Sequence, residues 1–221
     1  MPELFSLPGR YVHLEPMEMD HVDELMAAAA GDRSTFAFTH VPSTPETMAV
    51  YVTRAIEARG LGQHYPFVTR DIQTGRIVGA TRFYDMTPWD WSTGPAKANQ
   101  RHGRPDTVSI GATWLASSAQ RSPINTEAKR LMLTHAFETW GVWAVRFETD
   151  ERNARSRQAI ERLGCQLDGI LRAERPAADS TVRNTATFSM LADEWPVHRH
   201  RLVHRHRLVD RHRLVDRQAS G

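Results

Sequence analysis

A single cysteine, Cys165, stands among the 221 residues of this chain. An intramolecular disulfide needs two cysteines, so that form of cross-linking is excluded, as is a zinc site built on several thiolates. Cys165 follows an apolar helical segment, where a buried and unreactive thiol is the usual explanation. A chain of this length is long enough for one domain with a proper core.

Long apolar runs and a basic-then-apolar leader are also missing from the sequence. A membrane-spanning helix needs about 18 or more consecutive apolar residues, and a secretory leader needs a charged start before its apolar stretch. We therefore expect a cytoplasmic protein that neither spans a membrane nor is secreted.

Several enzyme signatures are absent as well. The sequence contains no Gly-x-Ser-x-Gly elbow, no Walker loop, no Gly-x-Gly-x-x-Gly and no His-Glu-x-x-His. Of its 11 histidines, five lie in residues 197–221 and the others are scattered, so no metal site is expected.

Charge is unevenly distributed along the chain. Residues 197–221 have seven arginines and two aspartates, a net charge of +5, so the total of +2 leaves residues 1–196 with −3. The high isoelectric point is therefore a property of the tail, and residues 1–196 give no reason to expect a nucleic-acid-binding domain.

The tail consists of three copies of Arg-His-Arg-Leu-Val-His/Asp in residues 199–216. A six-residue period forms no single stripe on a helix and places adjacent Leu and Val on opposite faces of a strand. We expect residues 197–221 to be a disordered, solvated basic extension. Contact with RNA or another polyanion is the less favoured alternative.

Hydrophobic periodicity predicts a mixed α/β domain over residues 1–196. The expected strands are residues 10–15, 65–70, 76–84, 108–114, 142–149, 166–172 and 185–191. The expected helices include residues 20–30, capped by Asp20; residues 45–59, opened by Ser43 or Thr44; and residues 153–163. Residues 87–106 have no period, and Trp89 and Trp91 there either form an aromatic wall for a substrate or, as we favour, staple the loop to the core.

One stretch joins a strand, a polar turn and a helix. Residues 108–114 alternate with a period of two, and an apolar stripe from Ala128 to Ala136 follows a helix cap at Asn125 or Thr126. The free N–H groups and the positive dipole end of such a helix can hold a phosphate. Any parallel α/β connection has this form, so the arrangement alone is weak evidence of a site.

The sequence of this turn, QRSPINTEAK, resembles the pyrophosphate loop of the GNAT superfamily of acyl-coenzyme A transferases. The pattern of that loop, Gln/Arg-x-x-Gly-x-Gly/Ala, aligns with Gln120 to Asn125. Pro123 and Asn125 replace the two small residues, and Pro123 has no N–H to offer. The looser pattern TWL-x5-R-x3-NTEAK is similar to the ribosomal-protein N-terminal acetyltransferase subgroup. This resemblance implies a GNAT-like fold and acyl-coenzyme A contacts from Trp114, Leu115, Gln120, Arg121, Ser122, Ile124, Asn125, Thr126, Asn153 and Ser156.

A second unit, NARSRQAIERLGC, matches the superfamily pattern at Asn153, Ser156 and Gly164. As lone residues, Asn153 and Ser156 would be read as helix caps. Many relatives have a tyrosine at the position of Ile160 that protonates the departing thiolate. Isoleucine cannot do so, and the resemblance makes Ser156 the candidate donor, although the thiolate can also leave with water's help.

An amine must lose a proton before it attacks a thioester, and a carboxylate can accept that proton. Glu148, five residues before Asn153, matches a catalytic glutamate of one ribosomal-protein acetyltransferase branch. An ordinary strand glutamate is the competing interpretation, and Glu174 and Asp85 are less specific candidates.

We therefore expect an N-acyltransferase that moves an acetyl group from acetyl-CoA to a primary amine by direct attack in a ternary complex. The amine would belong to a protein N-terminus, a lysine or a small molecule. A non-catalytic acyl-CoA-binding module, a transferase for another acyl group such as succinyl, and an RNA-associated protein that binds through its tail are the alternatives. A homodimer is left open.

Overall fold

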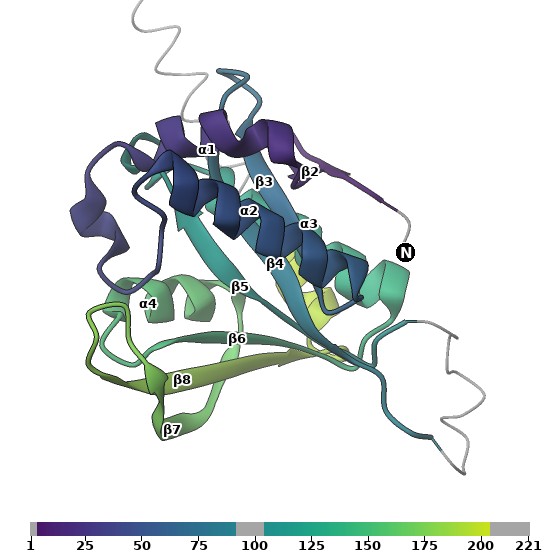
Figure 1. The fold of residues 1–221 in the computed structure, drawn as a ribbon. Coiled ribbons are helices and arrows are strands. Elements are labelled where there is room, and N and C mark those ends of the chain that lie inside the picture. Colours follow the sequence, from purple (N-terminus) through teal and green to yellow (C-terminus); the bar gives the residue numbers. More distant parts are fainter. Residues whose placement is uncertain (1–3, 92–103, 204–221) are drawn as a thin grey trace, which may run out of the picture.

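The computed structural model describes residues 4–91 and 104–203, and within them an eight-stranded sheet has the order β1-β2-β3-β4-β5-β6-β8-β7 (Figure 1). Its strands are β1 (Leu7–Pro8), β2 (Val12–Pro16), β3 (His64–Asp71), β4 (Ile77–Thr87), β5 (Thr107–Leu115), β6 (Ala144–Asp150), β7 (Gln166–Pro176) and β8 (Val182–Leu191). Neighbouring strands are antiparallel apart from β5 and β6, which are parallel. The prediction of a mixed, mostly antiparallel α/β sheet is confirmed.

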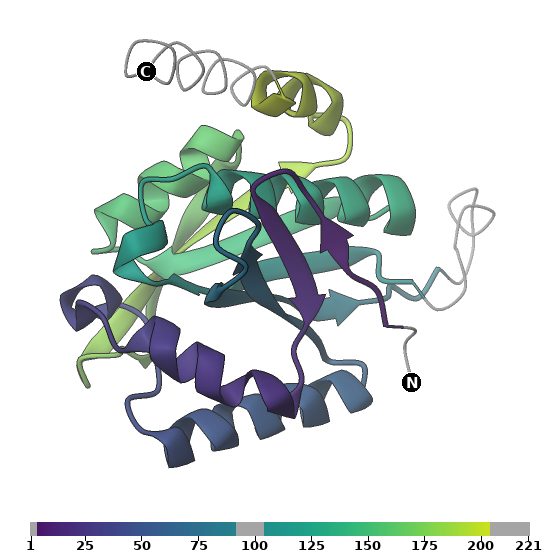
Figure 2. The same cartoon turned by 90° about the horizontal axis from the view of Figure 1, so that it is seen from above.

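Helices cover both faces of this sheet. They are η1 (Met19–His21), α1 (Val22–Ala29), η2 (Arg33–Phe36), α2 (Pro45–Gly60), η4 (Ser117–Ala119), α3 (Ile124–Thr134), the π-helical η5 (His135–Trp140) and α4 (Ala154–Leu163). Figure 2 shows α1 and α2 against one face and α3 with the C-terminal helical segment against the other. None of the helices within the described ranges is both long and apolar enough to cross a membrane.

The parallel pair β5–β6 is joined over only part of its length. Pairing ends at Ser109 and Arg146, whereas β5 continues to Leu115 and β6 to Asp150. The strands diverge beyond that point (Figure 1). Backbone groups in the middle of the sheet are therefore left free of the ladder, and the sheet opens into a wedge.

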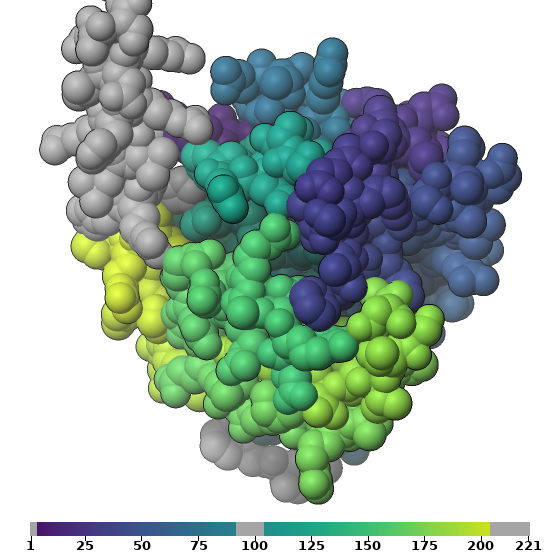
Figure 3. All heavy atoms as spheres, turned by 90° about the vertical axis from the view of Figure 1, so that its left-hand side faces the viewer, coloured from purple at the N-terminus to yellow at the C-terminus, as the bar shows by residue number. Residues whose placement is uncertain are grey.

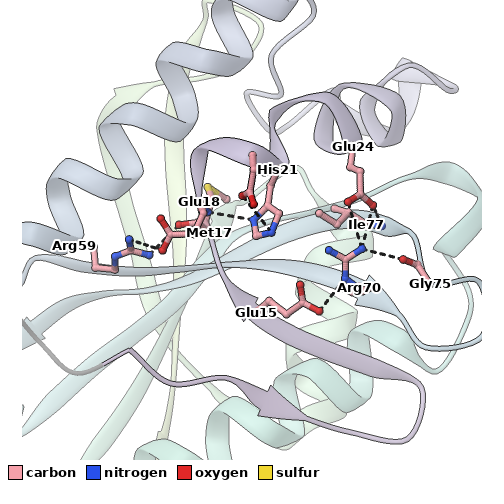
Figure 4. Close-up of polar contacts among 10 residues, drawn as sticks. Glu15, Met17, Glu18, His21, Glu24, Arg59, Arg70, Gly75 and Ile77 are labelled. Carbon is pink, nitrogen blue, oxygen red and sulfur yellow. Dashed lines mark hydrogen bonds and ion pairs between the residues drawn. The ribbon is translucent and has the colours of Figure 1, made fainter.

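Two arginines fasten α1 and α2 to the sheet (Figure 4). Arg59 of α2, 9% exposed, donates to the carbonyl oxygen of Met17 at 2.8 Å and pairs with Glu18 at 2.8 Å. Arg70 of β3 pairs with Glu15 at 2.8 Å and with Glu24 of α1 at 3.1 Å. Because both guanidinium groups lie in largely buried surroundings, the pairs fix the position of the helices more than exposed ones would.

A buried carboxylate fastens α3 to the opposite face. Glu127, 3% exposed, accepts hydrogen bonds from the backbone N–H of Tyr11 at 2.6 Å and of Val12 at 3.1 Å. It also pairs with Arg130 at 3.2 Å. The position of α3 is therefore set by contacts to the start of β2.

The helix starts differ from two predictions. Asp20 is not a cap: the chain enters α1 through η1, where Glu18 and His21 form a capping box. Asn125 and Thr126 are not caps either, because α3 begins at Ile124 directly after Pro123, with no side-chain cap. Proline has the φ of a helix start already, so the helix begins earlier than the apolar stripe indicates.

Trp89 and Trp91 of the irregular loop were expected either to form an aromatic wall for a substrate or to staple the loop to the core. Asp106, 9% exposed, accepts from the backbone N–H of Trp89 at 2.7 Å and from the indole N–H of Trp91 at 2.9 Å. Trp91 also lies against Trp143, with ring centroids 6.2 Å apart. These contacts favour the staple over a substrate wall; the part of the loop at residues 92–103 lies outside the described residues.

The prediction that residues 197–221 are disordered is wrong for residues 197–203. Residues 195–203 are helical, and Leu202 is only 2% exposed. Trp195 stacks on Phe137 with centroids 5.5 Å apart and donates to Glu138 at 2.9 Å. Packing against the domain therefore overrides the lack of a helical stripe in the repeat; the rest of the tail, residues 204–221, lies outside the described residues.

Candidate active site

The wedge between β5 and β6 opens into a cavity of about 1310 Å³. Its walls come from η2 and the segment after it, α2, β4, β5, the turn before α3, β6, α4 and the β7–β8 turn. Figure 3 shows the segment after α1, the turn before α3, α4 and the β7–β8 turn around a hollow on this face. Both β-turn-α units therefore end at the same cavity.

The first unit, β5–turn–α3, presents backbone groups to this cavity. A bulge at Ala112, whose φ is 46°, shifts the register of β5 against β4. The first-turn N–H groups of a helix have no intrahelical partner. In α3 the N–H of Ile124 donates to the Oγ of Ser122 at 3.3 Å, whereas Asn125 and Thr126 line the cavity in the same first turn. The positive dipole end of an eleven-residue helix therefore faces the cavity without a side-chain cap.

Gln120 connects the two units. Its Nε2 donates to the carbonyl oxygen of Leu115 at 3.0 Å, and its Oε1 accepts from Arg155 of α4 at 2.8 Å. Arg121, in the left-handed region at φ 58°, also lines the cavity. The two arginines and the free N–H groups form a cationic surface of the kind that holds a pyrophosphate.

The second unit, β6–turn–α4, presents side chains instead. Asn153 is the N-cap of α4, and its Oδ1 accepts from the backbone N–H of Ser156 at 3.0 Å. Asn153 therefore caps α4, as expected for this residue taken alone. Ser156 lines the cavity, and its own hydroxyl is not used in that cap.

Glu148 lies on β6 where the strands have diverged. Its side chain is 17% exposed, and its Oε2 accepts from Arg175 at 3.0 Å. Across the gap, burial and then the charge of Glu148 raise the pKa of Tyr84, so that this phenol stays protonated. Tyr84 is close enough to Gly111 that a Cβ there would come within 2.9 Å of the ring, so Gly111 makes room for it.

Of the residues expected from the sequence to contact coenzyme A, together with Glu148, all but Ile124 line this one cavity. Ile124 is 5% exposed and belongs to the core, because α3 begins at that residue and turns its side chain inward. The alternative bases are placed elsewhere. Neither Glu174 nor Asp85 lines the cavity, and hydrogen bonds from Arg175 and Thr185 lower the pKa of Glu174.

Sequence reasoning missed Lys129, which lines the cavity although it is 5% exposed. Its Nζ donates to the hydroxyls of Thr81 at 2.7 Å and Thr113 at 2.6 Å. Burial lowers its pKa from 10.5 to about 7. The apolar stripe that begins at Ala128 gives the next residue no sign of burial, so only tertiary structure shows it.

Ile160 and Cys165 agree with their expected surroundings. Ile160, 7% exposed, lies on the wall of the cavity that α4 forms, with no group able to exchange a proton. Cys165 is buried, and burial raises the pKa of its thiol to about 12. In residues 4–91 and 104–203, no group of three or more His, Cys, Asp or Glu side chains is placed to hold a metal ion.

Solved structures share the fold of this chain. A GCN5-related N-acetyltransferase from Brucella melitensis is 26% identical, with a TM-score of 0.76 over 91% of this chain and 85% of that chain. Mycobacterium smegmatis RimJ, in complex with CoA-disulfide, is 22% identical, with a TM-score of 0.73 over 92% and 93%. The ribosomal-protein-S5-alanine acetyltransferase from Vibrio fischeri is 15% identical, with a TM-score of 0.67 over 86% and 98%. The last two likenesses concern the fold alone.

No curated protein matches the chain in sequence. The family model described as an acetyltransferase (GNAT) domain matches residues 12–166, which is well over half of the chain and includes both β-turn-α units. This chain therefore belongs to the GNAT acetyltransferase family.

Proposed function

We propose that the protein moves the acetyl group of acetyl-CoA to a primary amine by direct attack in a ternary complex, in the cytoplasm. The amine belongs to a protein N-terminus, a lysine or a small molecule. The observation that supports this most is a single cavity that contains both an uncapped helix N-terminus and, at the divergent strands, the carboxylate of Glu148. The first suits the pyrophosphate of coenzyme A, and the second suits an ammonium group.

In this proposal, Glu148 takes a proton from the acceptor ammonium, directly or through a water molecule. Arg175 occupies Oε2 at 3.0 Å and holds the carboxylate in place, which leaves Oε1 for the proton. The neutral amine nitrogen then forms a bond to the thioester carbon. The C–S bond breaks, and the electron pair leaves on the sulfur of coenzyme A. The attacking nitrogen loses its second proton to water, which leaves a neutral amide.

Ser156 is the proposed donor to the departing thiolate. Its backbone is fixed by the Asn153 cap, and its hydroxyl is left for the cavity. A thiolate is stable enough near neutral pH to leave with water's help, so this contribution is the smaller one. Ile160 offers no such proton.

Ile160 also favours a second candidate, a module that binds acyl-CoA without transferring the acyl group. One experiment separates the two. The protein is incubated with acetyl-CoA and a panel of peptides, amino acids and polyamines, and the release of free thiol is followed. The proposal expects release that depends on at least one amine.

The melting temperature with coenzyme A is recorded in parallel. At about 100 times the dissociation constant, a ligand stabilises the folded state by about 2.7 kcal/mol. A thermal shift without thiol release from any amine would support the binding module. The absence of a shift at millimolar coenzyme A would contradict both candidates.

A further inference from the structure

The acceptor end of the cavity is cationic beyond what coenzyme A requires. The wall of the whole cavity contains seven arginines and one lysine but only two carboxylates, Glu46 and Glu148. Arg121, Arg155 and Arg162 lie on the turn before α3 and on α4, where the phosphates are expected. Arg82 and Arg183 lie on β4 and β8, away from that turn.

Strand pairing places these two arginines on the same face of the sheet as Glu148. Tyr84 is paired with Ser109, Ser109 with Arg146, and residues two apart on a strand share a face. Arg82 therefore shares the face of Arg146 and Glu148. On the far side, Glu148 is paired with Thr187, so Arg183 shares that face as well. Glu148 is flanked by a cation from each side.

The contacts that Arg82 and Arg183 make within the described part of the chain are to uncharged groups. The guanidinium of Arg82 lies 5.8 Å from the ring centroid of Tyr84, and its Nε is buried without a hydrogen-bond partner. The Nε of Arg183 donates to the neutral hydroxyl of Thr185 at 2.8 Å. Neither forms an ion pair with a described carboxylate, whereas Arg175 beside them has both Glu148 and Glu174.

A guanidinium removed from water without a counter-charge is costly. Burial, with Arg175 nearby, lowers the pKa of Arg183, although the charges of Glu174, Asp150 and Glu148 act in the opposite direction. Arg183 therefore has carboxylates around it, whereas Arg82 has the buried Nε without a partner. His64, which also lines the cavity, has a buried Nδ1 without a partner, and burial lowers its pKa so that it adds no charge at neutral pH. The site is thus short of an anion on the Arg82 side of the proposed base.

Resting on the proposed function, we propose that the acceptor is a primary amine that also bears a carboxylate, as an amino acid does, with the amine at Glu148 and the carboxylate held by Arg82. Arginine pairs with a carboxylate through two parallel N–H bonds, so it supplies orientation as well as charge. A cation at Arg82 and an anion at Glu148 on the same face match the two charges of a zwitterion, whereas a polyamine would place a second positive charge near Arg82.

The test compares amines in matched pairs that differ only in a carboxylate or a carboxamide. Suitable pairs are glycine with glycinamide, β-alanine with β-alaninamide, and 4-aminobutyrate with its amide, each with acetyl-CoA. Because the amide also changes the basicity of the amine, the readout is how the carboxylate preference in kcat/KM changes between wild type and variants. We expect Arg82→Gln to reduce the preference about tenfold, and Arg183→Gln, on the other side of Glu148, to reduce it much less.

Two further variants make the result specific. Arg82→Lys keeps the charge and should restore part of the preference. Arg76→Gln, in the exposed β3–β4 turn, should leave it unchanged. The thermal shift by coenzyme A should persist in all of them. A preference that is absent in the wild type, or unchanged in Arg82→Gln, overturns the inference.

Two other arms separate this inference from the proposed function. Calorimetric titration of the same amines into the coenzyme A complex detects the carboxylate site without turnover. If carboxylates bind through Arg82 but no thiol is released, the catalytic proposal fails and the site stands. If Arg82→Gln instead impairs transfer from succinyl-CoA to carboxamide amines, the carboxylate belongs to the acyl group and the inference on the acceptor is wrong.

Discussion

The two β-turn-α units of this protein have the same form but treat their helix starts in opposite ways. In β5–turn–α3, Pro123 precedes the helix and no side chain caps it. In β6–turn–α4, Asn153 caps the helix through the N–H of Ser156. The first unit therefore keeps its positive helix end for a ligand, whereas the second satisfies its own and offers side chains.

In the proposed function, the two β-turn-α units therefore have different roles in the cavity. Backbone N–H groups and a helix dipole bind phosphate whatever the neighbouring side chains are, so Pro123 and Asn125 in place of small residues are compatible with the phosphate site that we propose at this turn. Proton transfer needs a particular side chain at a particular place, and Glu148 and Ser156 both come from the second unit. Changes in the first unit should therefore affect binding, and changes in the second should affect turnover.

The largest expected effect is at Glu148. Glu148→Gln keeps the shape of the side chain but removes the basic oxygen, so turnover should fall roughly 10²-fold or more at neutral pH. A higher pH should restore part of the rate by supplying free amine. Glu161→Gln, on the exposed side of α4, is the control. Full activity of Glu148→Gln at every pH, with activity lost in Ser156→Ala or a Glu174 variant, would make Glu148 an ordinary strand glutamate.

A second test concerns what supports the second unit. The helical residues 195–203 pack behind α4, where the imidazole of His198 lies against Gly164 and Leu202 is 2% exposed. Leu202→Ala should lower the free energy of unfolding by about 2–4 kcal/mol, measured with urea. Val197→Ala, at a position 62% exposed, should change it little. Equal stability of chains that end at residues 196 and 203 would show that this helix does not support the domain.

The buried lysine of the first unit predicts a pH effect on stability. The pKa of Lys129 is lowered from 10.5 to about 7, so the unfolded chain holds one more proton between those values. Stability should therefore rise with pH across that window, by up to about 1.4 kcal/mol per pH unit from this group, and the full cost is present below it.

Lys129→Met should remove this slope because it removes the titrating amine. The hydroxyls of Thr81 and Thr113 still bond to each other at 2.9 Å, so neither is left without a partner. Urea unfolding from pH 7 to 10 measures it. Lys97→Met, at the only other lysine of the sequence, is the comparison. A slope that survives in Lys129→Met would place the titration elsewhere.

Ser156 should matter less than Glu148. Ser156→Ala leaves the backbone N–H that Asn153 caps, so stability should hold while turnover falls about tenfold. Asn153→Ala should do the reverse and cost about 1 kcal/mol of stability through the lost cap. Stopped assays and thermal melts of both variants give the comparison. A loss of stability in Ser156→Ala would show that its hydroxyl is structural.

Local patterns predicted much of this site. Alternation and cap residues are properties of neighbouring residues, so β5, β6 and α4 were predicted nearly as observed, together with the cavity positions of Glu148, Asn153 and Ser156. The position of Ile124 was not, because whether a first-turn side chain faces the core depends on the residue at which the helix begins.

Features decided by distant contacts could not be predicted. Lys129 is buried because the hydroxyls of Thr81 and Thr113, on β4 and β5, accept its hydrogen bonds. Leu202 is buried because Trp195 stacks on Phe137 and brings the start of the repeat onto the domain. Arg82 and Arg183 flank Glu148 only through strand pairing across the sheet. Each depends on residues far apart in the chain.

The division between the two helix starts is tested most directly by calorimetry of coenzyme A with the same isosteric change at each. Asn125→Asp places a negative charge at the uncapped start of α3, where it repels phosphate at a cost of about 1 kcal/mol, or about fivefold in affinity. Asn153→Asp keeps a good cap and should change the affinity much less. Neither should lower the melting temperature of the free protein. Asn153→Asp weakening coenzyme A binding as much as Asn125→Asp would contradict the division of roles.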